Sequence, residues 1–447
     1  MTRWIRHFLC VKRTENARNT KCSEIINSQE RIDQTLGKAW QGLQGNLPKS
    51  MLLAFFQVFL VIIPIIVPYF QQHGLSMQQV FLTQAWFGAV VVIMEVPSGV
   101  LADQFGRKKA LVLGAFFLAC GHLSLLWADS FTGFLIFEGL LGIGVSLISG
   151  ADLALLYDTE LALNRVDESP RAVANLYSMH SASEAIAAIA CSLLLLVSID
   201  AVVVIQVVAG CLPMLIAMTL VEPDHKAGQE HEPLRFAEVL KHLVANGSIM
   251  RWTVLSLSLW SLTTFFAVWI LQRYWFENDV PLTMFGYLWA GYTAIAGLAG
   301  RWAVRTEARL GITGLLVLIG LLPVLGYVGL ATMPLLFALV VSVAFFMARG
   351  LGLVVLRDAL NRRTPSHFRA TANSMASFGF RAAFVVAGPL VGAFMDVTDM
   401  TATLWLLAAG SMVISLGVLA PLWLAIARSE LSPADGVPAS MNREGPD

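Results

Sequence analysis

Long apolar runs alternate with short polar stretches along most of this chain. A helix that crosses a lipid bilayer needs roughly 20 apolar residues, and by that criterion the sequence predicts twelve such helices. The predicted spans are 51–70, 78–101, 110–128, 132–157, 171–198, 201–221, 250–273, 282–304, 310–331, 334–358, 370–395 and 400–427. The pattern therefore predicts an all-α integral membrane protein.

The longest polar stretch between two spans separates the sixth from the seventh. It runs from Glu222 to Gly247 and divides the spans into two sets of six. We expect a basic N-terminal tail (1–49), a six-helix bundle (50–221), a central loop (222–249), a second six-helix bundle (250–427) and a C-terminal tail (428–447). Both tails and the central loop are expected to be cytoplasmic.

Two short stretches recur at matching places in the two halves. SGADLALLYD, from Ser149, matches RGLGLVVLRD, from Arg349, and RAVAN, from Arg171, matches RATAN, from Arg369. Helical transporters are often built from such repeats, with the binding site between them near the midplane of the membrane. The repeat favours two pseudo-symmetric halves.

Basic residues gather in the loops on one side of the predicted membrane. The loops after spans 2, 8 and 10 contain Arg107, Lys108, Lys109, Arg305, Arg309, Arg357, Arg362, Arg363 and Arg369. The opposite loops contain no Lys or Arg apart from Arg273, at the end of span 7. Because cytoplasmic loops carry the excess of Lys and Arg, we expect both termini in the cytoplasm and the chain in a bacterial inner membrane.

Composition supports a membrane protein and excludes several other classes. The chain is 57% hydrophobic and 13% charged, and its mean hydropathy is +0.69. Thirty Lys and Arg balance thirty Asp and Glu, which gives no reason to expect a nucleic-acid partner. The five cysteines lack metal-ligand or redox spacing, and there is no P-loop and no nucleophile beside a base. We expect no metal, no cofactor and no enzymatic activity.

The loop after the second span carries the most specific motif. It reads GVLADQFGRKK over residues 99–109, and we call it the latch loop. Gly99 would allow close backbone approach and Gly106 a tight turn, while Asp103, Arg107 and Lys108 place charge at the cytoplasmic surface. Two glycines, one acid and three bases in this order are more specific than an ordinary basic loop.

This loop resembles that of the major facilitator superfamily, in which Gly, three residues, Asp, two residues, Gly and two basic residues lie between helices 2 and 3. The longer stretch EVPSGVLADQFGRK is similar to a bacterial branch near the drug-efflux groups. The resemblance covers roughly residues 50–428 and implies a secondary active transporter that works by alternating access. It also implies that Asp103 faces the start of helix 11, and that Arg107 pairs with Asp158 in the outward-open state.

Two features depart from the drug–proton exchangers of that family. Glu138 stands where those proteins carry an Arg on helix 4, whereas Gly142 and Gly144 are retained. Their Gly-Pro motif on helix 5 is missing, but AGPLVG lies in the eleventh span, with Gly388 and Gly392. We expect a close backbone approach and a local bend at that place.

Ionisable side chains inside the spans are functional candidates, because each costs about 2.5–3.5 kcal/mol on insertion scales. Glu184 and His180 lie four residues apart on the fifth span and share a face, and Arg381 lies at similar depth on the eleventh. Two interpretations stay open. Either Glu184 and His180 titrate protons while Arg381 holds an anionic group of the substrate, or Glu184 and Arg381 form a structural bridge beside a packed His180.

Other candidates lie on helices 4 and 10. Arg349 is expected to bind a substrate anion or to gate the cavity. Asp152, six residues from Asp158 on the same helix, is expected to partner Arg349 across the cavity or to join the charges of the latch loop with Arg107. Glu138 is expected near the outer third of its helix, with its side chain reaching external water.

Two more side chains complete the candidate set. Trp260 lies well inside the seventh span and is the aromatic residue that we expect in the cavity. Glu95 lies near the cytoplasmic end of the second span, and we expect it to pair with the arginines of the latch loop.

These features predict a monomeric transporter that moves a small molecule across the bilayer. We expect proton-coupled efflux of an amphiphilic or organic-anion compound. An importer of a metabolite or of a chelated-iron siderophore would share every feature above. A receptor or scaffold without transport activity is an alternative of another class.

Overall fold

Helices form all the regular structure in the parts of the chain that the computed structural model describes, which are residues 40–223, 247–364 and 369–431. The first half contains α3 (Asn46–Gln57), η1 (Ile63–Ile65), α4 (Ile66–Gln72), α5 (Met77–Phe105), α6 (Arg107–Ser124), η2 (Leu125–Trp127), α7 (Phe131–Ser149), α8 (Asp152–Ala162), η3 (Val166–Glu168), α9 (Ser169–Leu194) and α10 (Ile199–Met218). The second half contains α12 (Ser248–Leu255), η4 (Ser256–Trp260), α13 (Ser261–Glu277), α14 (Leu282–Thr332), α15 (Leu335–Val341), α16 (Val343–Arg363), α17 (Arg369–Val397), α18 (Met400–Ile414), η6 (Ser415–Leu419) and α19 (Ala420–Leu431). Most of the predicted tails and central loop lie outside the described residues.

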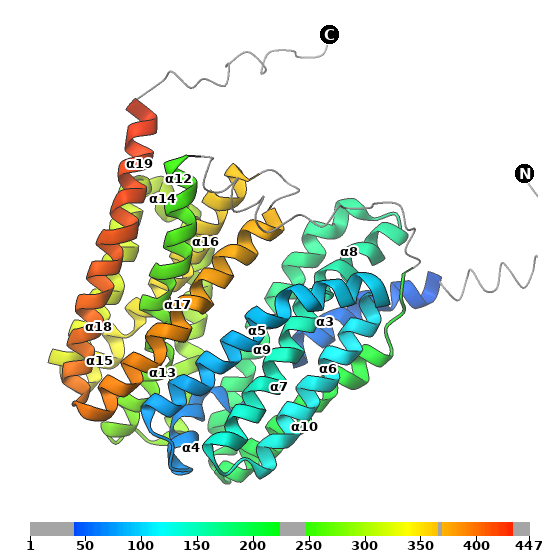
Figure 1. The fold of residues 1–447 in the computed structure, drawn as a ribbon, viewed down its shortest axis with the longest axis horizontal. Coiled ribbons are helices and arrows are strands. Elements are labelled where there is room, and N and C mark those ends of the chain that lie inside the picture. Colours follow the sequence, from blue (N-terminus) through cyan, green and yellow to red (C-terminus); the bar gives the residue numbers. More distant parts are fainter. Residues whose placement is uncertain (1–39, 224–246, 365–368, 432–447) are drawn as a thin grey trace, which may run out of the picture.

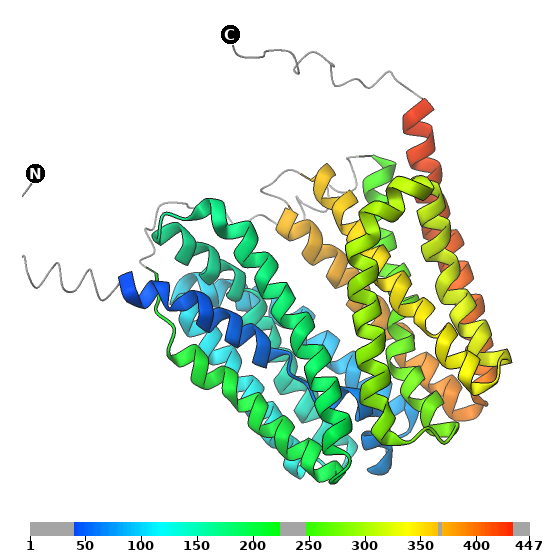
Figure 2. The same cartoon turned by 180° about the vertical axis from the view of Figure 1, so that it is seen from behind.

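The two halves pack side by side and diverge toward one end. They meet mainly through α5 against α17 and α9 against α14. In Figure 1 the halves lie close together near α4 and separate toward α8 and α16, and Figure 2 shows the same arrangement from behind. We call the diverging end, which carries the latch loop, the basic end. The closed end, which carries Asp129, Asp200 and Asp396, is the acidic end.

Membrane-spanning length and hydropathy agree with an all-α membrane fold. Among the described residues, nine helices are long and apolar enough to cross a membrane. One of them, α14, holds the eighth and ninth predicted spans with a break at Gly311, where φ is 68°. The interrupted first span and the Ser- and Ala-rich α9 are not among the nine. The total of twelve therefore stays a prediction.

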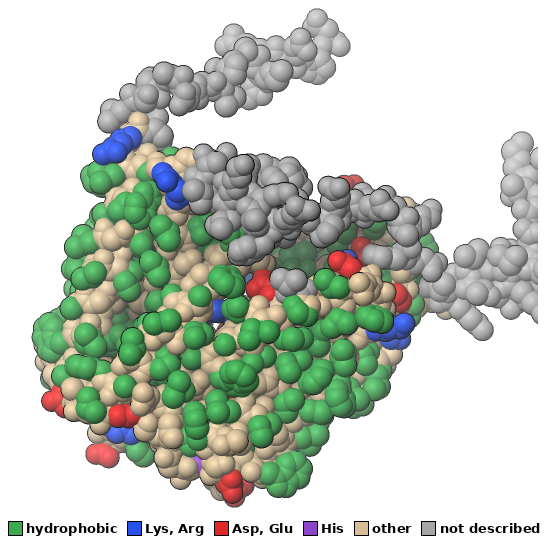
Figure 3. Space-filling view, viewed as in Figure 1, with side chains coloured by type: hydrophobic (Ala, Val, Ile, Leu, Met, Phe, Trp, Pro, Cys, Tyr) green, Lys and Arg blue, Asp and Glu red, His purple; other side chains and the backbone are tan. Residues whose placement is uncertain are grey.

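The surface has the polarity that a bilayer requires. Charged side chains gather at the two ends of the molecule in Figure 3, and apolar side chains cover much of the face between them. Large apolar side chains such as Ile93, Val208 and Val386 are exposed, which is favourable in lipid and unfavourable in water. Arg273, the one basic residue in the loops of the acidic end, lies 2.6 Å from Glu277, so its charge is paired.

The first predicted span is interrupted between α3 and η1, beside the space between the halves. Pro64 has no N–H to donate and disfavours a helical residue before it. The backbone N–H of Ile62 donates to Oε1 of Gln206 at 3.3 Å, and that of Val67 donates to Oε1 of Gln272 at 3.0 Å. Irregular backbone at membrane depth persists where protein groups satisfy it or where it lines a cavity.

We expect Gln206→Leu to destabilise the protein, because the buried N–H of Ile62 loses its acceptor. An unsatisfied buried donor costs roughly 1–3 kcal/mol, so the melting temperature in detergent should fall. Val208→Leu, on the same helix but 55% exposed, is the matched control and should leave it unchanged. Equal melting temperatures for both variants would show that Gln206 does not support the interruption.

Candidate functional site

A cavity of about 370 Å³ lies between the two halves. Its wall includes six aromatic side chains, which are Phe87, Phe137, Phe265, Trp269, Phe380 and Phe384. Its polar wall residues are Gln57, Gln84, His122, Glu138 and Arg381. The interrupted first span supplies much of the remaining apolar wall. A volume of this size is typical of small-molecule sites, which are mostly apolar with a few polar groups.

Arg381 is the only Lys or Arg among the described residues that line the cavity. Glu95, on α5, is the acid that acts on it electrostatically. No ion pair joins Arg381 to Glu184 in the described part of the chain, so the predicted bridge between them is wrong. The reason is that α17 packs along α5 and not along α9. Arg107 pairs with Asp103 and Asp158 and forms no ion pair with Glu95 in the described part of the chain, so the predicted pairing of Glu95 with the latch loop is also wrong.

Glu184 lies instead within electrostatic range of Arg349. Its helix, α9, packs against α14, which also packs against α16, the helix that carries Arg349. Nε2 of His180 is buried and has no hydrogen-bond partner among the described residues, and its ring meets Tyr177 edge-on with centroids 6.2 Å apart. These groups form a second polar site between the halves, separate from the wall of the cavity.

Glu138 lines the cavity and does not reach external water, so that prediction is wrong. It is 5% exposed, and its Oε1 accepts a hydrogen bond from Nε2 of Gln84 at 2.5 Å. The neighbouring Gly139 explains the burial, because a Cβ at that position would lie 2.8 Å from Nε1 of Trp86. Such close packing of α7 on α5 removes the carboxyl group from the surface.

Asp152 lies inside the first half and off the wall of the cavity. Its Oδ1 accepts a hydrogen bond from the N–H of Leu153 at 2.6 Å, and it borders a small pocket with Gln57 and Leu176. It forms no ion pair with Arg107 in the described part of the chain, so the predicted cluster with the latch loop is wrong. The fourth predicted span breaks between α7 and α8, and Asp152 begins the second segment.

Trp260 is a packing residue and not a cavity residue, contrary to the prediction. It is 0% exposed, and its indole N–H donates to the carbonyl of Ile319 at 3.2 Å. A Cβ on Gly352 would lie 2.2 Å from its ring. Trp269, nine residues further on, lines the cavity, and its Nε1 is buried without a partner among the described residues. Trp260 thus packs against α14 and α16 of its own half, which carry Ile319 and Gly352.

Arg107 of the latch loop lies near two carboxylates, Asp103 of the same loop and its predicted partner Asp158 on α8. The guanidinium lies 2.6 Å from Asp103 and 3.9 Å from Asp158, and the Asp103 side chain is 67% exposed. Gly106 has φ 99°, which fits the predicted tight turn. Gly99 lies within α5, and nothing lies within 4 Å of the place its Cβ would occupy, so the predicted close approach is absent from this structure. The two halves diverge here.

Glu222 is a functional candidate that the sequence did not reveal. Its carboxylate accepts hydrogen bonds from the backbone N–H groups of Arg107, at 2.8 Å, and Lys108, at 2.7 Å. It therefore caps the start of α6, where backbone donors have no partner within the helix. Its position directly after the sixth span suggested only a loop residue.

Comparisons with known proteins agree on the fold. The family model described as Major Facilitator Superfamily matches residues 50–361. An uncharacterized transporter from Buchnera aphidicola subsp. Schizaphis graminum (strain Sg) is 35% identical over 80 residues, which are 18% of this chain and 20% of that protein. The match thus spans only about a fifth of that relative's length.

Two solved structures extend the likeness over most of the chain. A mutant of the nucleoside transporter NupG has a TM-score of 0.72 and 13% identity, covering 84% of this chain and 99% of that chain. A D-xylose-proton symporter has a TM-score of 0.68 and 14% identity, covering 85% of this chain and 97% of that chain. At such identities the likeness shows a common fold alone.

Proposed function

This chain belongs to the Major Facilitator Superfamily, and on that premise we propose that it is a proton-coupled exporter of small aromatic organic anions. The family and the curated relative are transporters, so the chain is a multi-pass membrane transporter and not an enzyme. We further propose that, within the superfamily, the chain is related to the drug-efflux groups, because it carries the stretch EVPSGVLADQFGRK. The two bundles, 50–221 and 250–427, would move about the cavity between them.

The cavity wall is the observation that carries the substrate class. A guanidinium binds a carboxylate through charge-assisted hydrogen bonds, and Arg381 supplies one beside six aromatic side chains that stack on planar groups. The buried Oε1 of Gln57 and Nε1 of Trp269 have no hydrogen-bond partners among the described residues. A bound substrate could therefore donate to Gln57 and accept from Trp269. A volume of about 370 Å³ favours a small molecule over a chelated-iron siderophore.

Glu138 is the group to which we assign the coupled proton. It lies in the cavity wall, and its hydrogen-bond partner in the described part of the chain is the neutral amide of Gln84. Carboxyl groups at this depth are expensive to keep and mark proton or ion pathways. Glu184, near Arg349, is a further carboxyl group that could carry a proton, and it lies outside the cavity wall.

The basic loops support the proposed location. Latch-loop and helix 10 arginines lie together at the basic end, so we place that end and both termini in the cytoplasm of a bacterial cell, with the chain a monomer in the inner membrane. The halves diverge at this end (Figure 1). This state would therefore load its substrate from the cytoplasm.

A ligand screen and a flux assay test the proposal. A ligand that binds only the folded protein raises its melting temperature, and we expect salicylate and 1-naphthoate to do so, whereas nucleosides and pentoses should not. A rise in melting temperature with nucleosides or pentoses alone would exclude aromatic carboxylates as the substrate class.

Flux assays test the direction of transport. Inverted vesicles with a proton gradient should accumulate the same carboxylates. Uptake into right-side-out cells would indicate an importer, and binding without flux a receptor.

We expect Asp103→Asn to slow carboxylate efflux roughly fivefold, because a charge-assisted contact of about 1 kcal/mol is lost when the basic end closes. Efflux from inverted vesicles at equal protein levels measures this. Asp167→Asn, a similar change at an exposed site of the same end, should have no effect. Equal rates for both variants would remove Asp103 from the transport cycle.

A further inference from the structure

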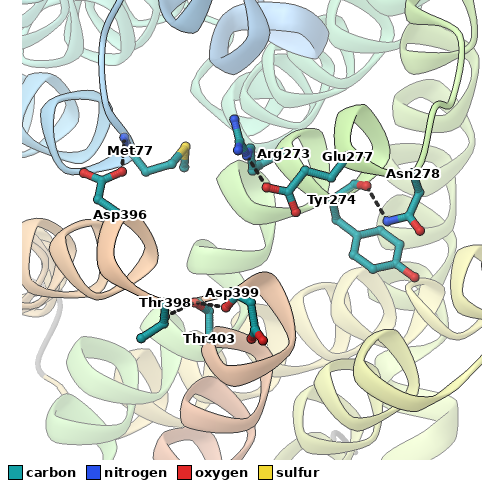
Figure 4. Close-up of polar contacts among 9 residues, drawn as sticks. All are labelled: Met77, Arg273, Tyr274, Glu277, Asn278, Asp396, Thr398, Asp399 and Thr403. Atoms are coloured by element: carbon teal, nitrogen blue, oxygen red, sulfur yellow. Dashed lines mark hydrogen bonds and ion pairs between the residues drawn. The ribbon is translucent and has the colours of Figure 1, made fainter.

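The carboxylate of Asp396 joins the two halves at the acidic end. It lies near the end of α17, and its two oxygens accept hydrogen bonds from the backbone N–H groups of Met77, at 2.8 Å, and Gln78, at 2.9 Å. Figure 4 shows the side chain pointing at the start of α5. The donors belong to the first half and the acceptor to the second, 319 residues away from Met77 along the chain.

These contacts complete the N-terminal cap of α5. The first N–H groups of a helix have no partner within it, and they carry the positive end of the helix dipole. Ser76 accepts a hydrogen bond from the N–H of Gln79 in a capping box, but it leaves the first two donors free. Asp396 takes both of them. Part of the cap of this helix therefore depends on the other half of the molecule.

Gly392 brings the two backbones together one turn before Asp396. A Cβ at this position would lie 2.6 Å from the Cα of Gln78 and 2.7 Å from the carbonyl oxygen of Met77. Both neighbours are backbone atoms, so no side-chain adjustment would make room. The carboxylate and the glycine thus act on the same short stretch of α5.

The opposite ends of the same two helices are arranged differently. Both α5 and α17 are 29 residues long, they run antiparallel, and each carries an aspartate within its last turn. Asp103 of α5 is 67% exposed and pairs with Arg107 of its own half. Among the described residues of these two helices, a carboxylate is bound to the partner helix at the acidic end alone.

We propose that Asp396 is a gating residue that holds the acidic end closed and must leave the start of α5 before that end opens. Opening then exposes two uncapped backbone donors and an unpaired carboxylate to water, so the contact sets the balance between the two open states. This inference rests only on the alternating-access part of the proposed function. It does not depend on the substrate, the proton or the direction of transport.

Distances between spin labels at the two ends test the proposal without any substrate. One pair, Val197→Cys with Leu336→Cys, spans the halves at exposed sites of the acidic end, and a second, Leu161→Cys with Leu310→Cys, does so at the basic end. The full-length chain, with its five native cysteines replaced by alanine, carries one pair at a time. We expect Asp396→Asn to lengthen the first distance and to shorten the second, with the closed-to-open ratio of the acidic end falling roughly tenfold.

Asp399→Asn is the matched control. This carboxylate lies three residues further on and accepts from the N–H of Ala402 at 2.6 Å, so it caps a helix of its own half. Its variant should keep the native distances, and Asp396→Glu should restore them in part. Native distances in Asp396→Asn would overturn the proposal. If that variant does not fold, Gly392→Ala perturbs the same contact, and native distances in Gly392→Ala would overturn the proposal equally.

Discussion

Replacing Arg381 by Gln is expected to lower the affinity for aromatic carboxylates roughly 100-fold, the largest effect that we predict. Truncating one partner of a buried, hydrogen-bonded charge pair costs about 2–5 kcal/mol, and a 100-fold change in affinity corresponds to about 2.7 kcal/mol. No other Lys or Arg among the described residues lines the cavity, so nothing there replaces the lost charge. Thermal-shift titration with 1-naphthoate measures the effect directly.

Two further variants test which property of Arg381 binds the anion: one keeps the positive charge without the guanidinium geometry, and the other removes an arginine outside the cavity. Arg381→Lys keeps the charge but loses the two-pronged geometry, so it should retain part of the affinity. Arg309→Gln removes the same group from an exposed position outside the cavity, and it should bind as the unaltered protein does. If Arg381→Gln binds 1-naphthoate with unaltered affinity, Arg381 does not recognise the anion.

The second large effect is expected for Glu138→Gln. The amide keeps the size of the side chain and a carbonyl oxygen for Nε2 of Gln84 but exchanges no proton. Gradient-driven accumulation should therefore fall roughly tenfold or more, as expected for the loss of a coupling free energy between two ligands. Exchange of substrate for substrate without a gradient should continue. Counterflow and gradient-driven uptake into inverted vesicles measure the two properties separately.

Two control variants, Glu184→Gln and Glu277→Gln, test whether the coupled proton is carried by Glu138 rather than by another glutamate. Glu277 pairs with Arg273 at the surface of the acidic end, so its variant should transport normally. Glu184 lies within electrostatic range of Arg349 and outside the cavity wall, so its variant should keep the coupling of transport to the proton gradient. Loss of coupling in Glu184→Gln, with coupling intact in Glu138→Gln, would move the proton to the second site.

Features that depend on neighbouring residues in the sequence could be predicted. The length and hydropathy of the apolar segments predict the membrane helices, because a helix in lipid must form its backbone hydrogen bonds within itself. Gly106 was expected in a tight turn and has φ 99°. The close approach expected at AGPLVG is present, since a Cβ on Gly392 would lie 2.6 Å from the Cα of Gln78.

Contacts between helices were not predictable, because helical periodicity does not say which helix a face meets. Equal depth in the membrane predicts that Arg381 pairs with Glu184, but α17 packs against α5, and the carboxylate that acts on Arg381 is Glu95. Depth in the membrane predicts Trp260 in the cavity, but Trp260 packs against α14 and α16 and Trp269 lines the cavity instead.

Hydrogen bonds from a side chain to a backbone N–H group are even harder to predict from a sequence. Asp396 lies close to a short polar loop, and its partners are N–H groups that any residue could supply at the start of α5. Glu222 at the start of α6 is the same case. Within the described part of the chain, both carboxylates bind backbone N–H groups, which any residue could supply.

Proton movement driven by substrate is the measurement that tests the central claim most directly. Proteoliposomes with a pH-sensitive dye inside, and no imposed gradient, receive 1-naphthoate outside. Because an exchanger moves protons outward as 1-naphthoate enters, coupled exchange through the cavity predicts alkalinisation of the lumen only when the protein is present, and its loss in both Glu138→Gln and Arg381→Gln. Flux of 1-naphthoate with no accompanying proton movement, or proton movement that persists in both variants, would contradict the account.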